Sequence, residues 1–249
     1  MSGAGLPQAA NAPFGHSEAA KPRAWANHAS AVFVTGTDTG IGKTWIAAAL
    51  LRSLCAAGFR AVGMKPVAAG FAPGTNVNAD VSELCDAGNV DAALDLRNPY
   101  SFAEPAAPHL IAAAAGVTID IARIADAYAR LRTRAGAVVV EGAGGALVPI
   151  DRTHDMLDIA AALSLPVLLV VGMRLGCINH ALLTALAVQR RGLALAGWVA
   201  NALPPRMALL EHNVDTLTER LGLAPIAIVA LGEDPAFDAA RLAMLGFAR

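Results

Sequence analysis

Short apolar runs alternate with longer amphipathic stretches along the chain from Ala31 onward. The runs are rich in β-branched residues and bounded by Gly or Pro, which is typical of buried strands, and the longer stretches have helical spacing. This alternation predicts an α/β fold with a mostly parallel sheet and helices on both faces. The predicted strands are Ala31–Thr35, Ala61–Lys65, Ala137–Glu141, Val167–Gly172, Leu195–Asn201 and Ile226–Leu231. The predicted helices are Lys43–Ala57, Ile119–Thr133, Asp155–Leu163, Ile178–Arg191, Met207–Leu221 and Ala236–Leu245.

Residues 1–29 have a different composition, rich in Ala, Gly, Pro and Asn. We expect them to form a flexible extension that carries no chemistry. Residues 30–249 contain neither an internal repeat nor a linker-like stretch, so we expect them to form one domain.

The overall composition indicates which kinds of molecule the protein could bind. Apolar residues make up 55% of the chain and charged residues 16%, below the typical value of about 25%. This excess suits a sheet covered on both faces and apolar surface buried between subunits. The net charge of −1 and the absence of a basic stripe argue against binding to nucleic acid.

Two further features bear on location. The longest apolar run, Leu165–Met173, is about half of a membrane span of about 20 residues, so it is interpreted as a buried strand. The cysteines Cys55, Cys85 and Cys177 are scattered and predict neither a disulfide framework nor a zinc site. Because the N-terminus also lacks the pattern of a signal peptide, we expect a cytoplasmic protein without a membrane partner.

The strongest local motif is Gly36-Thr-Asp-Thr-Gly-Ile-Gly-Lys-Thr44, which follows a predicted strand and opens a predicted helix. This is the context of a phosphate-binding P-loop, in which backbone N–H groups and the helix N-terminus hold a phosphate chain. Lys43 would reach the β- and γ-phosphates, and the Thr44 hydroxyl would bind Mg²⁺. The spacing is not strict, because Thr37 stands where the first Gly of the motif belongs. The alternative is a Gly-rich turn that only joins strand to helix.

Three more residues are candidates for the same site. Glu141 ends an apolar run and precedes glycines, so its carboxylate could face the phosphate loop and bind Mg²⁺. Asp80 is either a second metal ligand or a helix N-cap. Lys65 ends a predicted strand and is either a charge-stabilising group or a surface lysine.

Six ordered segments between Ala31 and Asn201 resemble the dethiobiotin synthase family. They begin at the P-loop and continue through Lys65-Pro-Val-Ala68 and the segment from Asn98-Pro-Tyr100 through Phe102-Ala-Glu-Pro105 to Pro108-His109. The remaining three are Val140-Glu-Gly-Ala-Gly-Gly145, Gly176-Cys-Ile-Asn-His180 and Gly197-Trp-Val-Ala-Asn201. The resemblance implies that residues 30–249 form a P-loop ATP-dependent ligase domain. It also implies a reaction in which 7,8-diaminononanoate, CO₂ and ATP give dethiobiotin, ADP and phosphate.

The resemblance also implies roles for individual residues. Lys43, Lys65 and Thr39 would act on the carbamate and phosphoryl oxygens, and Thr44, Asp80 and Glu141 would hold Mg²⁺. The family is a homodimer in which Gly176, Cys177 and Ile178 of one subunit bind the carboxylate of the substrate held by the other. The residues implied in ATP binding are Gly40, Ile41, Gly42, Lys43, Thr44, Trp45, Asp80, Glu141, Gly142, Ala143, Gly144 and Asn201, with Leu231, Gly232 and Glu233 as an adenine loop.

The sequence departs from the family pattern at two positions near the site. Ala69 stands where many relatives have Ser, which removes a side-chain contact to substrate, and Gly40 replaces a common Glu.

Two other functions share the phosphate loop. An amidotransferase of the cobyrinate type would need a glutaminase domain, for which 249 residues leave no room. A partitioning switch of the ParA or MinD kind would carry an additional lysine early in the loop, and Thr37 and Asp38 offer none.

Overall fold

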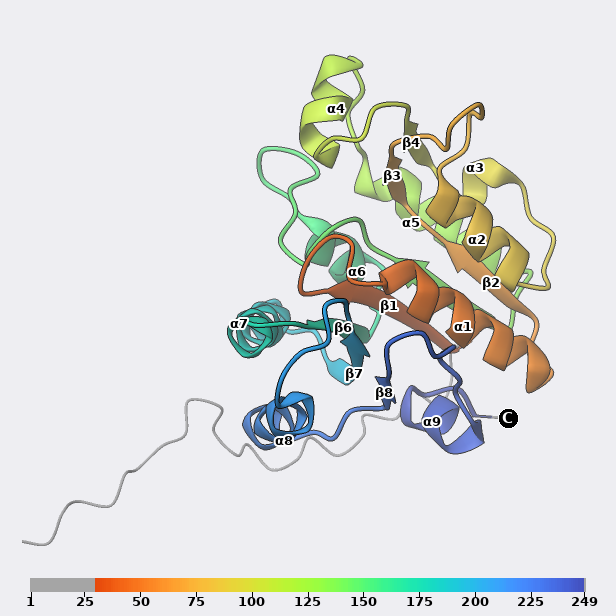
Figure 1. Ribbon diagram of the computed structural model, residues 1–249. Helices are drawn as coiled ribbons and strands as arrows, with labels where there is room; N and C mark the ends of the chain where they lie inside the picture. Colours follow the sequence, from red (N-terminus) through yellow and green to blue (C-terminus); the bar gives the residue numbers. More distant parts are fainter. Residues whose placement is uncertain (1–29, 249) are drawn as a thin grey trace, which may run out of the picture.

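The computed structural model describes residues 30–248, so the predicted extension of residues 1–29 lies outside the described residues. The centre of the molecule is a six-stranded sheet with the order β2-β5-β1-β6-β7-β8, and every pairing between its strands is parallel (Figure 1). The strands are β1 (Ser30–Gly36), β2 (Ala61–Met64), β5 (Ala137–Glu141), β6 (Val167–Met173), β7 (Leu195–Ala202) and β8 (Ala227–Val229). The predicted α/β fold is confirmed.

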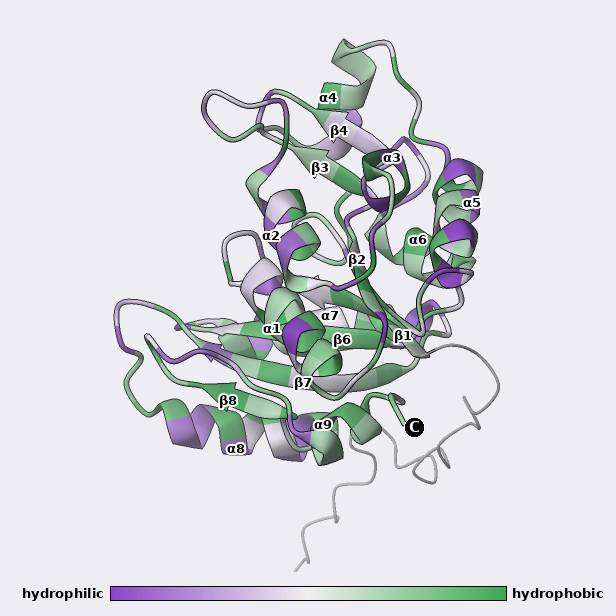
Figure 2. Cartoon of the chain, turned by 90° about the vertical axis from the view of Figure 1, so that its right-hand side faces the viewer, coloured by the Kyte–Doolittle hydropathy of each residue, from purple (hydrophilic) through white to green (hydrophobic). Residues whose placement is uncertain are grey.

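Helices cover both faces of this sheet because successive strand residues point to opposite sides. On β1, Val32 and Val34 pack with α1 (Lys43–Ala56) and α9 (Ala239–Met244). Phe33 faces the other way and packs with α5 (Ile121–Arg132) and α6 (Met156–Ala162). On the latter face, β6 and β7 are covered by α7 (Cys177–Arg190) and α8 (Leu210–Leu221). Figure 2 shows hydrophobic colouring along the central strands and hydrophilic positions on α5 and α8.

A smaller structure beside β2 was not predicted as strands. It is a two-stranded parallel sheet of β3 (Val67–Ala69) and β4 (Tyr100–Phe102), and α4 (Pro108–Ala114) follows it along the chain. Between its strands lie α2 (Ala79–Ala87) and α3 (Leu94–Arg97). In Figure 1 this part occupies the top of the view, above β2. Strands of three residues are too short to produce a periodic sequence signal.

Several predicted boundaries shift by a few residues, and two shifts matter for the site. Lys65 lies just beyond β2, because its N–H donates to the carbonyl of Arg97 at 2.7 Å instead of joining the sheet. The last strand is limited to the three residues that pair with β7, so Leu231 belongs to the turn that follows. Within residues 30–248, no helix has the length and apolar character that crossing a membrane requires.

Candidate active site

A cavity of about 800 Å³ opens beyond the carboxyl ends of β1, β2 and β5, where ligands bind in parallel α/β folds. One side is polar and comes from the phosphate loop and the strand ends. The other is formed by small apolar residues of β3 and the segment before α4. Predicted residues that line it are Thr39, Gly40, Gly42, Lys43, Thr44, Lys65, Asp80, Glu141, Ala143 and Gly144.

The phosphate loop has the geometry that a backbone cradle needs. Gly42 caps α1 in the left-handed conformation, with φ of 86°. A Cβ atom at this position would lie 2.4 Å from Nδ2 of Asn201, which itself donates to the carbonyl of Ile41 at 2.8 Å. The loop is therefore fixed from β7, and only glycine fits there.

Lys43 lies at the start of α1 and is buried. Its ammonium donates to the backbone carbonyl of Asp38 at 2.7 Å, inside the same loop. Burial lowers the pKa of Lys43 to about 8, while the carboxylate of Glu141 acts in the opposite direction. A phosphate chain in this loop would supply the counter-charge that the buried ammonium lacks.

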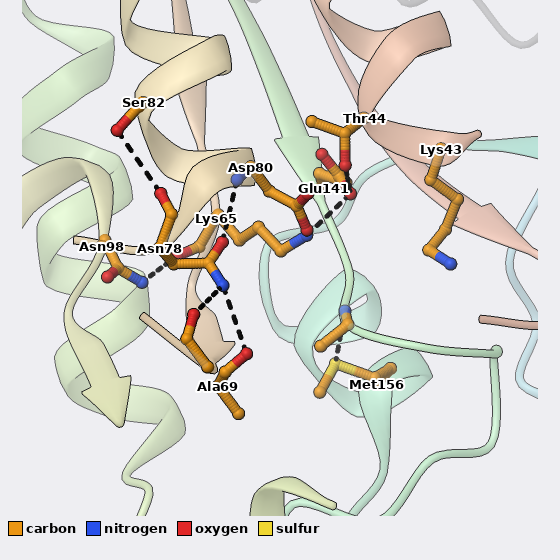
Figure 3. Close-up of polar contacts among 12 residues, drawn as sticks. Lys43, Thr44, Lys65, Ala69, Asn78, Asp80, Ser82, Asn98, Glu141 and Met156 are labelled. Carbon is orange, nitrogen blue, oxygen red and sulfur yellow. Dashed lines mark hydrogen bonds and ion pairs between the residues drawn. The ribbon is translucent and has the colours of Figure 1, made fainter. Parts of the chain in front are cut away.

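A charged cluster lies where the ends of β2 and β5 meet the starts of α1 and α2 (Figure 3). The ammonium of Lys65 donates to Oε1 of Glu141 at 2.8 Å and is also ion-paired with Asp80. The Thr44 hydroxyl donates to the same Glu141 oxygen at 2.8 Å. Glu141 is 0% exposed, so the structure excludes a solvent-facing role for this carboxylate, and the buried Lys65 is not a surface lysine.

The charges in this cluster shift one another. Burial raises the pKa of Glu141, and the ammonium of Lys65 counteracts part of that effect. Burial alone would lower the pKa of Lys65, but the carboxylates of Glu141 and Asp80 outweigh it and hold that pKa above its usual range. The pKa of Asp80 stays below its usual range, because Lys65 outweighs the opposing effect of burial. Lys65 therefore remains a cation at neutral pH.

The cluster also fits a magnesium ion. Thr44, Asp80 and Glu141 present oxygen donors of the kind that Mg²⁺ prefers, and one or two carboxylates suffice when phosphate and water oxygens complete the shell. Oε2 of Glu141 is buried and has no hydrogen-bond partner among residues 30–248. Leaving such an oxygen unpaired is costly, so this donor is available to a cation. Within residues 30–248, no three or more His, Cys, Asp or Glu side chains are grouped so that they could hold a metal ion by themselves.

Comparison with known proteins decides the family. The AAA domain family matches residues 30–234. The ATP-dependent dethiobiotin synthetase BioD of Aromatoleum aromaticum is 47% identical over 230 residues, which cover 91% of this chain and 99% of that protein. The chain belongs to the ATP-dependent dethiobiotin synthetase family.

Two solved structures match this member of the dethiobiotin synthetase family at low sequence identity. The MinC:MinD cell division complex of Aquifex aeolicus matches with a TM-score of 0.50 and 13% identity, over 87% of this chain and 85% of that chain. A ParA family ATPase of Chlorobium tepidum matches with a TM-score of 0.49 and 14% identity, over 87% and 89% of the two chains.

The remaining predicted site residues do not line the cavity. Asn201 lies behind the phosphate loop, Trp45 is half-buried on α1, and Ile41 and Gly142 are buried. The exposed residues Leu231, Gly232 and Glu233 form a turn after β8, beyond the same edge of the sheet that carries Asn201.

The turn that the dethiobiotin synthetase resemblance assigns to a substrate carboxylate lies at the start of α7, outside the cavity lining. One backbone N–H group of this turn is already bonded within the chain. The N–H of Cys177 donates to the carbonyl of Arg174 at 2.9 Å, because the chain tightens into a turn before the helix. Burial also raises the pKa of the Cys177 thiol, which disfavours the reactive thiolate form.

Several cavity residues were not among the predicted site residues. The apolar wall consists of small side chains that carry no chemical signal, and their role depends on the two-stranded sheet. Asn78 is the N-cap of α2, so the alternative that Asp80 is the cap is excluded, because Asp80 lies in the first turn. The sequence signal that could have identified Asn78 as the cap is an Asn two residues before Asp80 at the start of a helix. The residues are Ala68, Ala69, Asn78, Pro105, Ala106, Ala107, Pro108 and Val148.

Proposed function

We propose that this protein closes the ureido ring of dethiobiotin from 7,8-diaminononanoate, CO₂ and ATP, releasing ADP and phosphate. The observation that supports this proposal most strongly is the sequence identity of 47% to an ATP-dependent dethiobiotin synthetase along nearly the whole of both chains. The phosphate loop and the charged cluster beside it supply the groups that this ATP-dependent carbon–nitrogen bond formation requires.

The chemistry divides into three balanced steps. One amine of the diamine attacks CO₂ and loses a proton, which gives a carbamate. A carbamate oxygen then attacks the γ-phosphorus of ATP, and ADP leaves. Finally the second amine attacks the carbonyl carbon of the mixed anhydride, loses a proton and expels phosphate, which leaves a cyclic urea.

Two lysines and a threonine act on the reacting oxygens in this proposal. Lys43 gives up its bond to the Asp38 carbonyl and binds the phosphates, so that its charge is balanced by substrate. Lys65 offsets negative charge on the carbamate and transferred phosphoryl oxygens, and Thr39 contacts the carbamate at the cavity edge. Fixed cations of this kind need no reorganisation during the reaction.

The metal site of the proposal consists of Thr44, Asp80 and Glu141. Bound Mg²⁺ supplies Lewis-acid charge that neutralises the phosphate oxygens. Glu141 offers the buried oxygen that has no partner, and Asp80 offers a carboxylate now shared with Lys65. These residues also orient Lys65 relative to the phosphate loop.

The adenine would lie at the other end of the phosphate loop, near Asn201. The side-chain oxygen Oδ1 of Asn201 is buried and has no partner among residues 30–248, so it can accept from an amino group. The exposed turn Leu231–Glu233 lies beyond the same edge of the sheet as Asn201.

We further propose a cytoplasmic homodimer in which the substrate carboxylate binds to Gly176, Cys177 and Ile178 of the second subunit. The start of α7 lies outside the cavity of its own subunit, and Leu175 beside it is 96% exposed. An exposed leucine next to a helix N-terminus suits burial against a second copy.

The proposal predicts that product forms only with the complete set of reactants. Purified protein is incubated with diaminononanoate, bicarbonate, ATP and Mg²⁺, and each component is omitted in turn. ADP and a product with the mass of dethiobiotin should appear together, and only in the complete mixture. A nucleotide switch would instead hydrolyse ATP without the diamine, and that result without dethiobiotin would overturn the assignment.

A further inference from the structure

Two buried asparagines contact the backbone of the ion pair formed by Lys65 and Asp80. Asn78 is 8% exposed and Asn98 is 7% exposed. The reaction proposed above gives neither of them a role. Figure 3 shows both side chains pointing toward the backbone around this pair.

Asn98 holds the main chain of Lys65. Its Nδ2 donates to the Lys65 carbonyl at 2.7 Å and to the Tyr100 carbonyl at 3.0 Å. The N–H of Lys65 donates to the carbonyl of Arg97, the residue before Asn98, at 2.7 Å. Because Lys65 lies beyond the last paired residue of β2, these contacts replace the sheet as the support of its backbone.

Asn78 holds Asp80 in a similar way. Its Oδ1 accepts the N–H of Asp80 at 3.0 Å, which caps α2. Its Nδ2 donates to the carbonyls of Ala69 at 3.2 Å and Gly70 at 2.6 Å. One amide group therefore ties the first turn of α2 to the end of β3.

The two asparagines form hydrogen bonds at opposite ends of the small sheet of β3 and β4. Asn98 binds at the end where Val67 pairs with Tyr100, and Asn78 binds at the end where Ala69 pairs with Phe102. The sheet of β3 and β4 is thus the spacer that sets the distance between the backbones of Lys65 and Asp80.

We propose that Asn78 and Asn98 are positioning residues that hold Lys65 and Asp80 at the distance from each other that the reaction requires. The inference rests on the proposed function, in which Lys65 offsets charge on the transferred group. Lysine carries its ammonium on a flexible four-carbon stem, so its placement depends on a fixed backbone and a fixed partner. A displacement of about 1 Å at a reacting group can cost about 10²-fold in rate.

Substitutions separate this role from ordinary stabilisation. Asn78→Ser keeps an oxygen that can cap α2 but removes the donor to Ala69 and Gly70. Asn98→Ala removes the hydrogen bonds from the Asn98 side chain to the carbonyls of Lys65 and Tyr100. Asp120→Ala is the matched control, because Asp120 caps α5 through the N–H of Ala122 at 2.8 Å, outside the cavity lining.

Turnover is the first measurement. Asn78→Ser and Asn98→Ala should lower kcat by about 10- to 100-fold while KM for ATP changes far less, because the phosphate loop is intact. Asp120→Ala should lose stability comparable to Asn78→Ser but keep its kcat. Values of kcat within about twofold of the unaltered protein in both asparagine variants would overturn the proposal. If Asn98→Ala does not fold, Asn78→Ser decides alone.

A second measurement does not depend on the substrate. The chain contains only the lysines Lys21, Lys43 and Lys65, so ¹³C-labelled lysine gives three ε-methylene signals, and Lys65→Arg assigns one of them. The order parameter of the Lys65 signal should fall in both asparagine variants and stay unchanged in Asp120→Ala. An unchanged order parameter in both would refute the positioning role. A protein that makes no dethiobiotin but shows this loss of order would contradict the proposed function alone.

Discussion

Lysine is rare in this chain: of its 19 basic residues only Lys21, Lys43 and Lys65 are lysines. The latter two are buried at the candidate site, whereas the other cations of the described residues are arginines. A buried lysine changes its pKa with its surroundings, but an arginine remains charged in any of them. The two lysines show both outcomes, because the pKa of Lys43 falls and that of Lys65 rises.

Nucleotide binding should therefore depend on pH through Lys43. With a pKa of about 8 in the free protein, Lys43 loses its proton as the pH rises through that value. Bound phosphates favour the charged form, so binding takes up a proton there. Calorimetry in metal-free buffer should show the Kd for ATP rising about tenfold between about pH 7 and about pH 9.

Groups that face Lys43 have to be considered in this test. Glu141, Lys65, Asp80 and Asp38 contribute to its pKa. The pKa of Lys65 is held above its usual range and that of Asp80 below its usual range, so both side chains stay charged between about pH 7 and about pH 9. Lys43→Arg provides the control, since its charge does not titrate. A Kd in the unaltered protein that is constant between these pH values would contradict the prediction.

At the scale of elements, the junction between β1 and α1 is held by β7, far along the chain. The carbonyl of Ile41 accepts from Asn201, and the space for this contact exists only because residue 42 is glycine. The helix start that is expected to bind phosphate is thus built from the first and the seventh strands together.

Gly42→Ala should destabilise the fold more than a glycine substitution that meets only backbone strain. The left-handed conformation costs an alanine about 1–2 kcal/mol, and the displaced Asn201 contact adds about 1–3 kcal/mol. Gly192→Ala is the matched control, because Gly192 has φ of 68° and no atom within 4 Å of an added Cβ. Urea unfolding measures both, and equal losses would show that the contact with Asn201 does not matter.

At the scale of the whole molecule, the proposed homodimer with a shared site can be tested by combining two variants. Filling the α7 turn by Cys177→Trp would fail as a test, because Cys177 is buried between α7 and the sheet and a larger side chain would overpack that core. Gly176→Asp is a better blocking variant. Gly176 has φ of 97°, which Asp tolerates better than most residues, and an added Cβ meets only His180 at 4.0 Å.

Two inactive variants should restore activity when mixed. Gly176→Asp places a carboxylate where the substrate carboxylate is expected, and Lys43→Ala disables the phosphate loop. After subunit exchange, a heterodimer holds one composite site with both halves intact, so about half of the activity per heterodimer should return. Gly176→Asn, which has the same shape without the charge, should be much less impaired. Exchange confirmed by mass with no recovery would mean that each subunit builds its site alone.

The sequence by itself determined the order of the large elements and much of the polar side of the site. The six strands of the main sheet and the helices that cover it were predicted to within a few residues, since buried parallel strands are continuous apolar runs. Lys43, Thr44 and Glu141 were also predicted to line one site, because each stands at a strand end or a helix start along one edge of the sheet.

Only the tertiary structure decided how those residues are supported. Three of these supports join segments that are distant in sequence or too short for a periodic pattern. They are the pairing of β3 with β4, the hydrogen bond from Asn201 to Ile41 and the hydrogen bond from Asn98 to Lys65. The same holds for the N–H of Cys177, which a local turn consumes. Local patterns reflect which face of an element is buried, whereas these contacts depend on where the elements meet in space.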